Sequence, residues 1–339
     1  METAERSGLT LSGILATVLL ASCAGPASAP SPVADSPAAA EPVIASVIDP
    51  EPALPPAAPE DWVIVADAKP IPHCSSEATQ GGAIVCRAPP GVVLSLDGSP
   101  VARADNDGWA VIGLSRTQKT PAIVSLDLDT GDGVVPVSVT VPVLARKDTV
   151  AKLTMECNKI AAQSPAEKRH AEVSWVKKDK ALKTFANAVA PIGMIKPAEG
   201  PYSSPFGAVR TYVPKTKDCE GSTSVHNGQD IAIATGTDIH APMAGTVLLA
   251  DPDLYYEGGA VFLDHGYGLV SVMMHMSRID VADGQVVEQG EILGLSGSTG
   301  RVTGPHLHWA IKFRNVNSDD RGTDIWLDPV LMMGLALPQ

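Results

Sequence analysis

Four histidines and one aspartate mark the part of the sequence that could do chemistry. His226 and Asp230 lie four residues apart in the run His-Asn-Gly-Gln-Asp, His306 and His308 lie two apart, and His275 lies alone between the two groups. Zinc prefers neutral imidazole nitrogen and carboxylate oxygen, and a catalytic zinc site uses three protein ligands and leaves one position to water. This set of residues therefore predicts a zinc site with spare imidazoles for acid-base chemistry.

The spacing within each group suits convergence on one centre. A tight Asn-Gly-Gln turn that leads into a strand can bring His226 and Asp230 together. Residues two apart on a strand face the same side, so one of His306 and His308 can bind the metal while the other lies beside it. Either fragment alone is weak, because short patterns of this kind are more often structural than metal-binding. In this order and with glycine-rich flanks, they indicate a metal site much more strongly.

The elements that must position these residues are predicted to be strands. After Pro197 the sequence alternates short runs of β-forming residues with Gly, Pro and Asp, and no run has a helical period. We therefore expect a mainly β fold in which residues 196–339 form an antiparallel β domain. Residues 61–155 alternate with period two between Asp-Gly turns, which predicts a small β-sandwich of immunoglobulin-like pattern.

A helical connector is predicted between the two β regions, over residues 156–195. Ser164, Pro165 and Glu167 have the types and spacing of a capped helix start, and the helix is expected to run to about Val189. Its lysines and arginines make it the most basic stretch of the chain. Contact with an acidic polymer or an anionic lipid surface is one interpretation of these charges, and a solvated helix face is the one we favour.

The N-terminal residues predict export and lipid attachment. Residues 1–22 contain an apolar run that is too short to span a membrane and that ends in Leu-Ala-Ser before Cys23. This ending resembles the lipobox of bacterial lipoproteins, in which the cysteine is lipidated and becomes the first residue of the mature chain. Simple secretory cleavage and a cytoplasmic protein with an apolar N-terminus are the alternatives.

Residues 23–60 are predicted to be a tether. They are rich in Ala, Pro, Ser and Glu, and such a segment cannot bury enough apolar surface to offset its chain entropy, so we expect it to be disordered. We therefore expect a lipid-anchored protein on the periplasmic face of the bacterial cell envelope. Ala24, and not Asp, follows the cysteine, which favours the outer membrane over the inner one by analogy with enterobacterial lipoproteins.

The cysteines that remain after Cys23 are even in number, as expected for disulfides in an oxidising compartment. Four cysteines can pair in three ways, and all three remain open. The short, glycine-rich segment between Cys74 and Cys86 favours a disulfide between these two. Buried free thiols are the alternative if the protein is not exported. The four cysteines are Cys74, Cys86, Cys157 and Cys219.

The charge balance excludes one class of partner. The 339 residues include 25 Lys and Arg against 38 Asp and Glu, which gives a net charge of −13. Binding to phosphate groups requires clustered basic side chains, so we expect no nucleic-acid partner. Aromatic residues make up only 4% of the chain while Gly (30) and Pro (29) are abundant, which favours short strands and turns over long helices.

Five ordered motifs resemble those of the M23 (lysostaphin/LytM-type) zinc metallopeptidases. The similarity covers about residues 203–329, and residues 62–190 resemble more loosely the β-rich module that precedes the peptidase domain in some Gram-negative members. The resemblance implies an endopeptidase that cleaves peptide cross-links or interpeptide bridges of peptidoglycan. The motifs occupy residues 226–232, 263–268, 275–279, 284–290 and 298–309.

The resemblance implies roles for individual residues. His226, Asp230 and His308 match the ligands of one zinc ion, and His275 and His306 match the two unligated active-site histidines. One of these two would take the proton of the attacking water, and the other would hydrogen-bond the tetrahedral oxyanion. The sequence does not distinguish which histidine has which role.

Three further features bear on this comparison. Arg210 has two interpretations of equal weight, orientation of a substrate carboxylate or a structural ion pair. Ala310 stands where many members have Glu, so any support that Glu gives to its neighbours is absent. The loop over residues 213–225 looks longer than usual and could cover the cleft. None of these features removes a predicted ligand, so an active enzyme is expected.

The implied partners are peptidoglycan stem peptides as substrate, a membrane through the lipid anchor, and an envelope regulator as an open option. A carrier domain of biotinyl or lipoyl type resembles residues 241–247 and 284–292, but the chain lacks the hairpin lysine that such a domain needs. The stronger alternative is a catalytically silent M23-like protein that activates a cell-wall amidase. Such proteins typically lose zinc ligands, and this chain has all of them.

Overall fold

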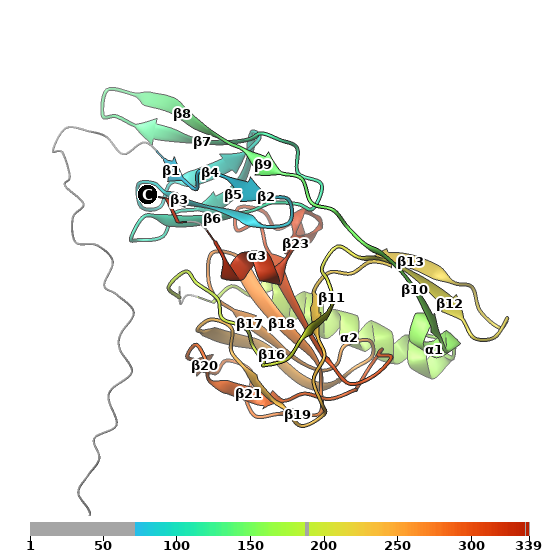
Figure 1. Ribbon diagram of the computed structural model, residues 1–339. Helices are drawn as coiled ribbons and strands as arrows, with labels where there is room; N and C mark the ends of the chain where they lie inside the picture. The colour runs from blue at the N-terminus through green and yellow to red at the C-terminus, as the bar shows by residue number, and fades with distance from the viewer. Residues whose placement is uncertain (1–71, 187–189, 336, 339) are drawn as a thin grey trace, which may run out of the picture. The chain divides into compact units, whose positions relative to one another are not determined.

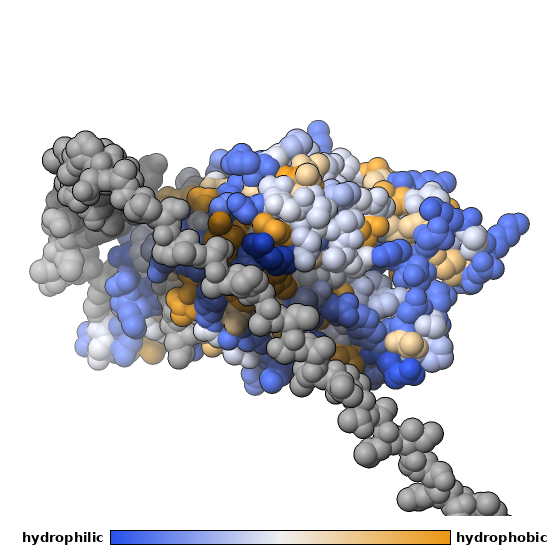
Figure 2. All heavy atoms as spheres, turned by 90° about the horizontal axis from the view of Figure 1, so that it is seen from below, coloured by the Kyte–Doolittle hydropathy of each residue, from blue (hydrophilic) through white to orange (hydrophobic). Residues whose placement is uncertain are grey.

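The computed structural model of the chain is mainly β, as expected (Figure 1), and describes residues 72–186, 190–335 and 337–338. The predicted signal peptide over 1–22, the lipidation site Cys23 and the tether over 23–60 lie outside the described residues. Among the residues that are described, no helix is both long enough and apolar enough to cross a membrane. Hydrophilic side chains cover most of the face seen in Figure 2, and the apolar residues exposed there form small patches, as is usual for a surface in contact with water.

The first β region is a sandwich. One antiparallel sheet has the strand order β5-β4-β7-β8 and the other the order β1-β3-β6, with a separate parallel pair, β2-β9. Val124 and Leu126, on one face of β7, are buried in a core shared with Ile84 and Ile112 of the other sheet. The strands are β1 His73–Cys74, β2 Ala78–Thr79, β3 Ala83–Arg87, β4 Val93–Leu96, β5 Ser99–Arg103, β6 Trp109–Gly113, β7 Ala122–Asp129, β8 Val134–Val141 and β9 Val143–Leu144.

One disulfide links two strands of this sandwich. Cys74 of β1 lies opposite Cys86 of β3 in the antiparallel register, and the two form a bond. This is the pairing that the short intervening segment favoured. The two sheets enclose one core, as the period-two pattern predicted, and the immunoglobulin-like likeness stays a prediction.

The second β region is built on an eight-stranded sheet in which every neighbouring pair is antiparallel. Its order is β11-β14-β22-β18-β17-β16-β20, and β23 also pairs with β22. A smaller antiparallel sheet has the order β15-β21-β19. The strands are β11 Tyr202–Ser204, β14 Gln229–Ile231, β15 Asp238–His240, β16 Gly245–Leu254, β17 Gly258–Asp264, β18 Leu269–Met276, β19 Arg278–Ile279, β20 Val286–Val287, β21 Ile292–Leu295, β22 Leu307–Phe313 and β23 Ile325–Leu327.

Both faces of the large sheet are buried near its centre. Trp309 of β22 and Val261 of β17 belong to the main core. Ala310 and Phe262, on the opposite face, pack in a second core with Ala181 of helix α2 (Pro165–Lys183). Burial on both faces explains why these strands are continuous apolar runs in the sequence and do not alternate with polar residues.

A third sheet has the order β10-β12-β13, with strands β10 Val150–Met155, β12 Val209–Pro214 and β13 Ser222–Val225. The sequence placed β10 at the end of the sandwich, but this strand pairs in parallel with β12. Strand-forming residues can be recognised from their local pattern, whereas the partner of a strand depends on contacts far along the chain. The parallel pair is also an exception to the antiparallel pairing expected in this region.

Helix α2 begins as predicted. Ser164 accepts a hydrogen bond from the Glu167 N–H, and the Glu167 carboxylate accepts one from the Ser164 N–H, which is a capping box. The helix ends at Lys183, earlier than the expected Val189. Buried Arg314 donates to the Thr184 carbonyl at this end, so that carbonyl is not left for a further turn. The other helices are α1 Cys157–Ile160, the 3-10 helix η1 Arg321–Thr323, and α3 Pro329–Met333.

Part of the basic surface of α2 is paired within the chain. Lys177 Nζ lies 2.6 Å from Asp251 Oδ2, and Lys178 Nζ lies 2.5 Å from Glu257 Oε1. Asp251 lies on β16 and Glu257 in the turn that follows it. These two lysines therefore attach the helix to the sheet and are not free for an external partner, while other basic residues of the helix face solvent.

One buried histidine makes the stability of the fold depend on pH. His265 is fully buried, with Nδ1 2.8 Å from the Ala244 carbonyl and Nε2 2.7 Å from Ser271 Oγ. Burial lowers its pKa from the usual 6.5 to about 4, so the folded protein holds it neutral while the unfolded chain takes up a proton below pH 6.5.

We expect this histidine to reduce the free energy of unfolding as pH falls from 6.5 to about 4, by up to about 3 kcal/mol. Its contribution is fully present above pH 6.5. Urea unfolding of the wild type and of His265→Gln at a series of pH values measures the effect. The variant should show a shallower pH dependence, and equal slopes for the two proteins would contradict the assignment.

Candidate metal centre

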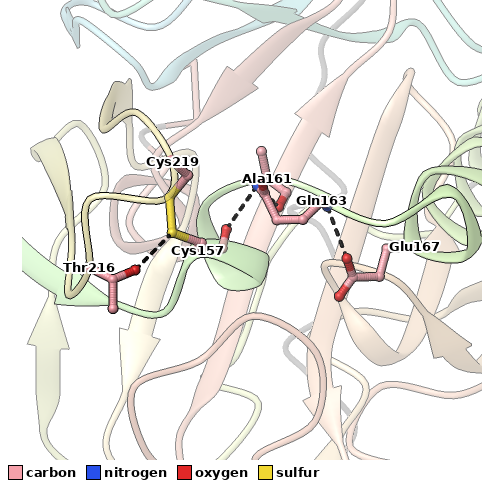
Figure 3. Close-up of a disulfide and its surroundings, with 6 residues drawn as sticks. All are labelled: Cys157, Ala161, Gln163, Glu167, Thr216 and Cys219. Carbon is pink, nitrogen blue, oxygen red and sulfur yellow. Dashed lines mark hydrogen bonds between the residues drawn. A yellow bond between two sulfur atoms is a disulfide. The ribbon is translucent and has the colours of Figure 1, made fainter.

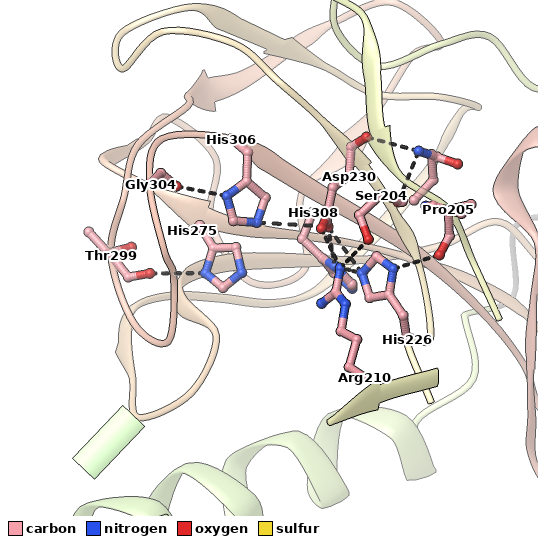
Figure 4. Close-up of polar contacts among 11 residues, drawn as sticks. Ser204, Pro205, Arg210, His226, Asp230, His275, Thr299, Gly304, His306 and His308 are labelled. Atoms are coloured by element: carbon pink, nitrogen blue, oxygen red, sulfur yellow. Dashed lines mark hydrogen bonds and ion pairs between the residues drawn. The ribbon is translucent and has the colours of Figure 1, made fainter. Parts of the chain in front are cut away.

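The register of two strands brings distant residues of the predicted set together. Strands β14 and β22 pair with Asp230 directly opposite His308. His226 precedes β14, and its backbone N–H donates to the Ala208 carbonyl while its carbonyl accepts from the Gly207 N–H, each at 2.8 Å. Strand pairing therefore places the His226, Asp230 and His308 side chains at one point, as Figure 4 shows.

A glycine lets these side chains approach one another. A Cβ on Gly228 would lie 2.6 Å from Nε2 of His308 and 2.6 Å from the Trp309 carbonyl oxygen. Both distances are too short for a carbon atom, so a larger residue would push the turn away from β22. The Asn-Gly-Gln turn inferred from the sequence therefore needs its glycine for close packing.

Three donor atoms face one another. His226 Nε2 lies 3.1 Å from Asp230 Oδ1, His308 Nδ1 lies 2.8 Å from the same oxygen, and the two nitrogens are 2.9 Å apart. For zinc bonds of 2.0–2.1 Å, tetrahedral geometry sets the edge between ligands at about 3.3 Å. The donor set therefore has close to the spacing that a tetrahedral zinc ion requires, and its chemistry of two imidazoles and a carboxylate also fits.

The protonation states of two of these residues suit metal binding, because ligands must be deprotonated. Burial lowers the pKa of His226 to about 4. Burial alone would raise the pKa of Asp230, but its polar contacts with the His226 and His308 side chains hold it well below its usual range. At neutral pH, His226 is therefore neutral and Asp230 is charged.

Hydrogen bonds behind the donor atoms fix their orientation. His226 Nδ1 lies 2.8 Å from the Pro205 carbonyl, so Nδ1 carries the proton and the lone pair of Nε2 faces the centre. Arg210 Nη2 donates to Asp230 Oδ2 at 2.6 Å and to Ser204 Oγ at 2.7 Å. Of the two interpretations of Arg210, the structure therefore shows the ion pair, which leaves Asp230 Oδ1 for the metal.

His275 is held beside the donor set by an unusual backbone conformation. Its φ of 67° lies in the left-handed region, which costs a non-glycine residue about 1 kcal/mol or more. The His275 N–H donates to the Glu257 carbonyl and Nδ1 lies 2.9 Å from the Thr299 carbonyl, which leaves the lone pair on Nε2. Burial, with the charges of nearby histidines, lowers its pKa well below the usual value, so the ring is neutral.

His306 lies next to His275, with ring centroids 4.8 Å apart. Its Nδ1 lies 2.8 Å from the Gly304 carbonyl, and its Nε2 lies 3.7 Å from Asp230 Oδ1. That distance places the ring beside the donor set and outside it. In both rings Nδ1 is bound to a carbonyl, and His306 Nε2 faces Asp230 (Figure 4).

The donor set opens into a cleft of about 830 Å³. Residues of the β10-β12-β13 sheet, of α2 and of β22 line it. The Arg301 guanidinium lies 5.3 Å from the ring centroid of Tyr212 and 5.0 Å from that of Tyr256, so it joins the three-stranded sheet to the turn between β16 and β17. The cleft therefore has a wall held by cation–π contacts.

The loop over residues 213–225, for which a cover of the cleft was one option, contributes to this wall. Its last residues form β13, and Ser224 and Val225 line the cleft. Cys219 of the loop is bonded to Cys157 of α1, as Figure 3 shows. This second disulfide ties the loop to the segment that precedes α2.

Several cleft residues were not found by sequence reasoning. Tyr212, Tyr256 and Arg301 come from separate elements, and nothing local in the sequence marks them as neighbours. Lys312 lies at an even spacing from His308 on the same strand, so the period of two could have placed it on the cleft face. A local sequence pattern therefore indicated the position of Lys312, whereas no such pattern indicated the other three residues.

Comparisons with known proteins agree with this arrangement. Residues 224–320 match the family model described as peptidase family M23. The chain is 42% identical over 89 residues to the peptidoglycan DD-endopeptidase ShyA of Vibrio cholerae, which covers 26% of this chain and 20% of that protein. It is 39% identical over 85 residues to the DD-carboxypeptidase/endopeptidase Mpg of Neisseria meningitidis, which covers 25% of this chain and 19% of that protein.

The aligned part is thus about a fifth of the length of these two relatives. A solved structure from Pseudomonas aeruginosa, whose description assigns it to peptidase M23, is 28% identical with a TM-score of 0.51. It covers 76% of this chain and 95% of that chain. The likeness to this structure therefore extends beyond the segment that the family model matches.

Proposed function

Because this chain carries a domain of peptidase family M23 over residues 224–320, we propose that it is a zinc-dependent endopeptidase that hydrolyses peptide cross-links of peptidoglycan. The observation that carries the proposal is the convergence of the His226, Asp230 and His308 donor atoms in a cleft beside the imidazoles of His275 and His306. Two relatives are named as a peptidoglycan DD-endopeptidase and a DD-carboxypeptidase/endopeptidase, which supports this substrate class.

The three donor residues would hold zinc, which would polarise the scissile carbonyl and acidify a water molecule. His306 Nε2 takes the proton from the attacking water and returns it to the leaving amine. The His306 side chain is 16% exposed, whereas His275 is buried, so His306 is the more accessible of the two to water in the cleft. His275, fixed by the Thr299 carbonyl, packs beside the His306 ring with its Nε2 lone pair unused by that hydrogen bond.

The alternative is a catalytically silent activator of a cell-wall amidase. Such a protein needs neither a complete donor set nor histidines with available Nε2 atoms. All three donor residues are buried and oriented here, and Arg210 reserves one oxygen of Asp230 for the centre. The burial of these polar side chains around one centre favours the enzyme over the activator.

A digestion of isolated sacculi tests the proposed function. Purified protein is expected to release muropeptides cut at a peptide bond, chelation should stop the release, and added zinc should restore it. Sacculi that remain intact with the protein alone, but are digested when an amidase is added, would support the activator. Release of muropeptides with intact peptides would contradict a peptidase.

We also propose that Cys23 carries a lipid that anchors the protein at the periplasmic side of the cell envelope, in the outer membrane. The sequence of the N-terminal segment supports this, because its apolar run ends in a lipobox-like tetrapeptide. Such an anchor would keep a cleft of this kind near peptidoglycan. Growth with a labelled fatty acid should tag the wild type and not Cys23→Ala, and an untagged wild type would contradict the proposal.

A further inference from the structure

The cleft continues past the donor set along β22. His308, Ala310 and Lys312 alternate along this strand and all line the cleft, whereas Trp309 and Ile311 point into the main core. Lys312 is four residues beyond His308, so the two backbones are roughly 13 Å apart along the strand. Between them lies Ala310, whose fully buried side chain packs in the second core and borders the cleft.

The ammonium group of Lys312 makes a long ion pair and a cation–π contact, but no hydrogen bond, with the described residues. Its Nζ lies 3.9 Å from Asp324 Oδ2, beyond hydrogen-bond distance, and 4.6 Å from the ring centroid of Trp326. No hydrogen bond joins Nζ to any of the described residues, although the side chain is only 14% exposed. The Lys312 ammonium can donate three hydrogen bonds, and it lines the cleft without donating one to the described residues.

The charges around Lys312 favour a further anion. Asp324 also contacts Arg321, whose Nη1 lies 3.3 Å from Asp324 Oδ1, so two cations share one carboxylate. Burial lowers the pKa of Lys312, and Asp324 offsets only part of this effect. The position therefore has an excess of positive charge in partly desolvated surroundings.

Neighbouring charges on α2 do not change this balance. Lys178 pairs with Glu257 at 2.5 Å, and Lys183 pairs with Asp179 at 2.7 Å. Each pair is neutral as a whole. A carboxylate that enters this end of the cleft would therefore meet the ammonium of Lys312 as its main partner, with the Trp326 ring as an apolar wall.

We infer that Lys312 and Trp326 form a subsite that binds a carboxylate of an extended acidic peptide, while another part of the same peptide lies at the metal centre. This inference rests on the proposed function and specifies which feature of the substrate is recognised. A separation of roughly 13 Å corresponds to about four residues of extended chain. Peptidoglycan stem peptides carry free carboxylates, so they have the chemistry that this subsite requires.

The test compares one cross-linked muropeptide dimer with free carboxylates and the same dimer with its carboxylates amidated. Lys312→Met should raise KM for the acidic dimer roughly 10- to 100-fold, because a hydrogen bond to a charged group is lost, while kcat changes little. Lys312→Arg should keep most of the affinity. Wild-type enzyme should show the same rise in KM on the amidated dimer, and Lys312→Met should not distinguish the two dimers.

The wild-type comparison needs no variant, so it stands even if Lys312→Met folds poorly, which thermal unfolding would reveal. Calorimetric binding of the two dimers separates this inference from the proposed function. If nothing is cleaved but the acidic dimer binds more tightly, the function fails and the subsite stands. If both dimers are cleaved or bound equally well by wild type, the subsite is overturned and the function stands.

Discussion

His308→Ala is expected to remove both bound zinc and turnover. His308 Nδ1 is within 2.9 Å of the other two donor atoms, so the substitution leaves only two ligands for the metal. The loss of activity should exceed the roughly 10²- to 10⁴-fold effect of removing one general acid-base group, because Lewis-acid and proton-transfer chemistry are lost together. Metal analysis of the purified variant and a muropeptide assay measure the two losses.

His73→Ala is the matched control, because His73 is exposed on β1 and outside the site. It should keep zinc and activity at the wild-type level. His226→Ala should behave like His308→Ala, since its Nε2 is part of the same donor set. A His308→Ala protein that holds one zinc ion per chain and cuts at a normal rate would show that the metal, if any, is bound elsewhere.

His306→Ala should separate metal binding from turnover. The His306 Nε2 atom is 3.7 Å from Asp230 Oδ1 and is not one of the converging donor atoms, so zinc content should stay close to that of the wild type. Turnover should fall by about 10²- to 10⁴-fold, the usual contribution of general acid-base catalysis. Metal content and kcat measured on the same preparation give the result.

Loss of zinc from the His306→Ala variant would make His306 a ligand. Unchanged kcat would exclude it from proton transfer.

The residues of the candidate site could be proposed from the sequence because they occur in two short groups in a fixed order with glycine-rich flanks. His226 with Asp230, and His306 with His308, each have a spacing that a turn or a strand converts directly into a shared direction. What the sequence could not supply is the register between β14 and β22, which places Asp230 opposite His308. The closeness of Asp230 and His308 was inferred from the resemblance to a known family.

The features that sequence reasoning missed depend on long-range contacts. The parallel pairing of β10 with β12 joins strands on either side of α2, and no local pattern marks it. The early end of α2 depends on Arg314, the residue directly after β22, which approaches the last turn. Helix α3 could have been predicted, because Asp328 and Pro329 have the types of an N-cap and a first helical residue.

Arg210 shows the limit of reasoning by residue type. Its charge allowed either a substrate contact or an ion pair, and the position of Asp230 Oδ2 at 2.6 Å shows that the ion pair forms. The same pairing explains how a buried carboxylate can direct one oxygen to a metal. The orientation of the Arg210 side chain could not be predicted from the sequence.

The central claim is that one zinc ion held by His226, Asp230 and His308 makes this chain a peptidase. Digestion of a defined cross-linked muropeptide, read by mass spectrometry beside the zinc content of the same sample, tests it most directly. The account predicts hydrolysis of a peptide bond by wild type in proportion to bound zinc, and no hydrolysis by His308→Ala. Cleavage by zinc-free protein, or an intact muropeptide after incubation with fully zinc-loaded wild type, would contradict it.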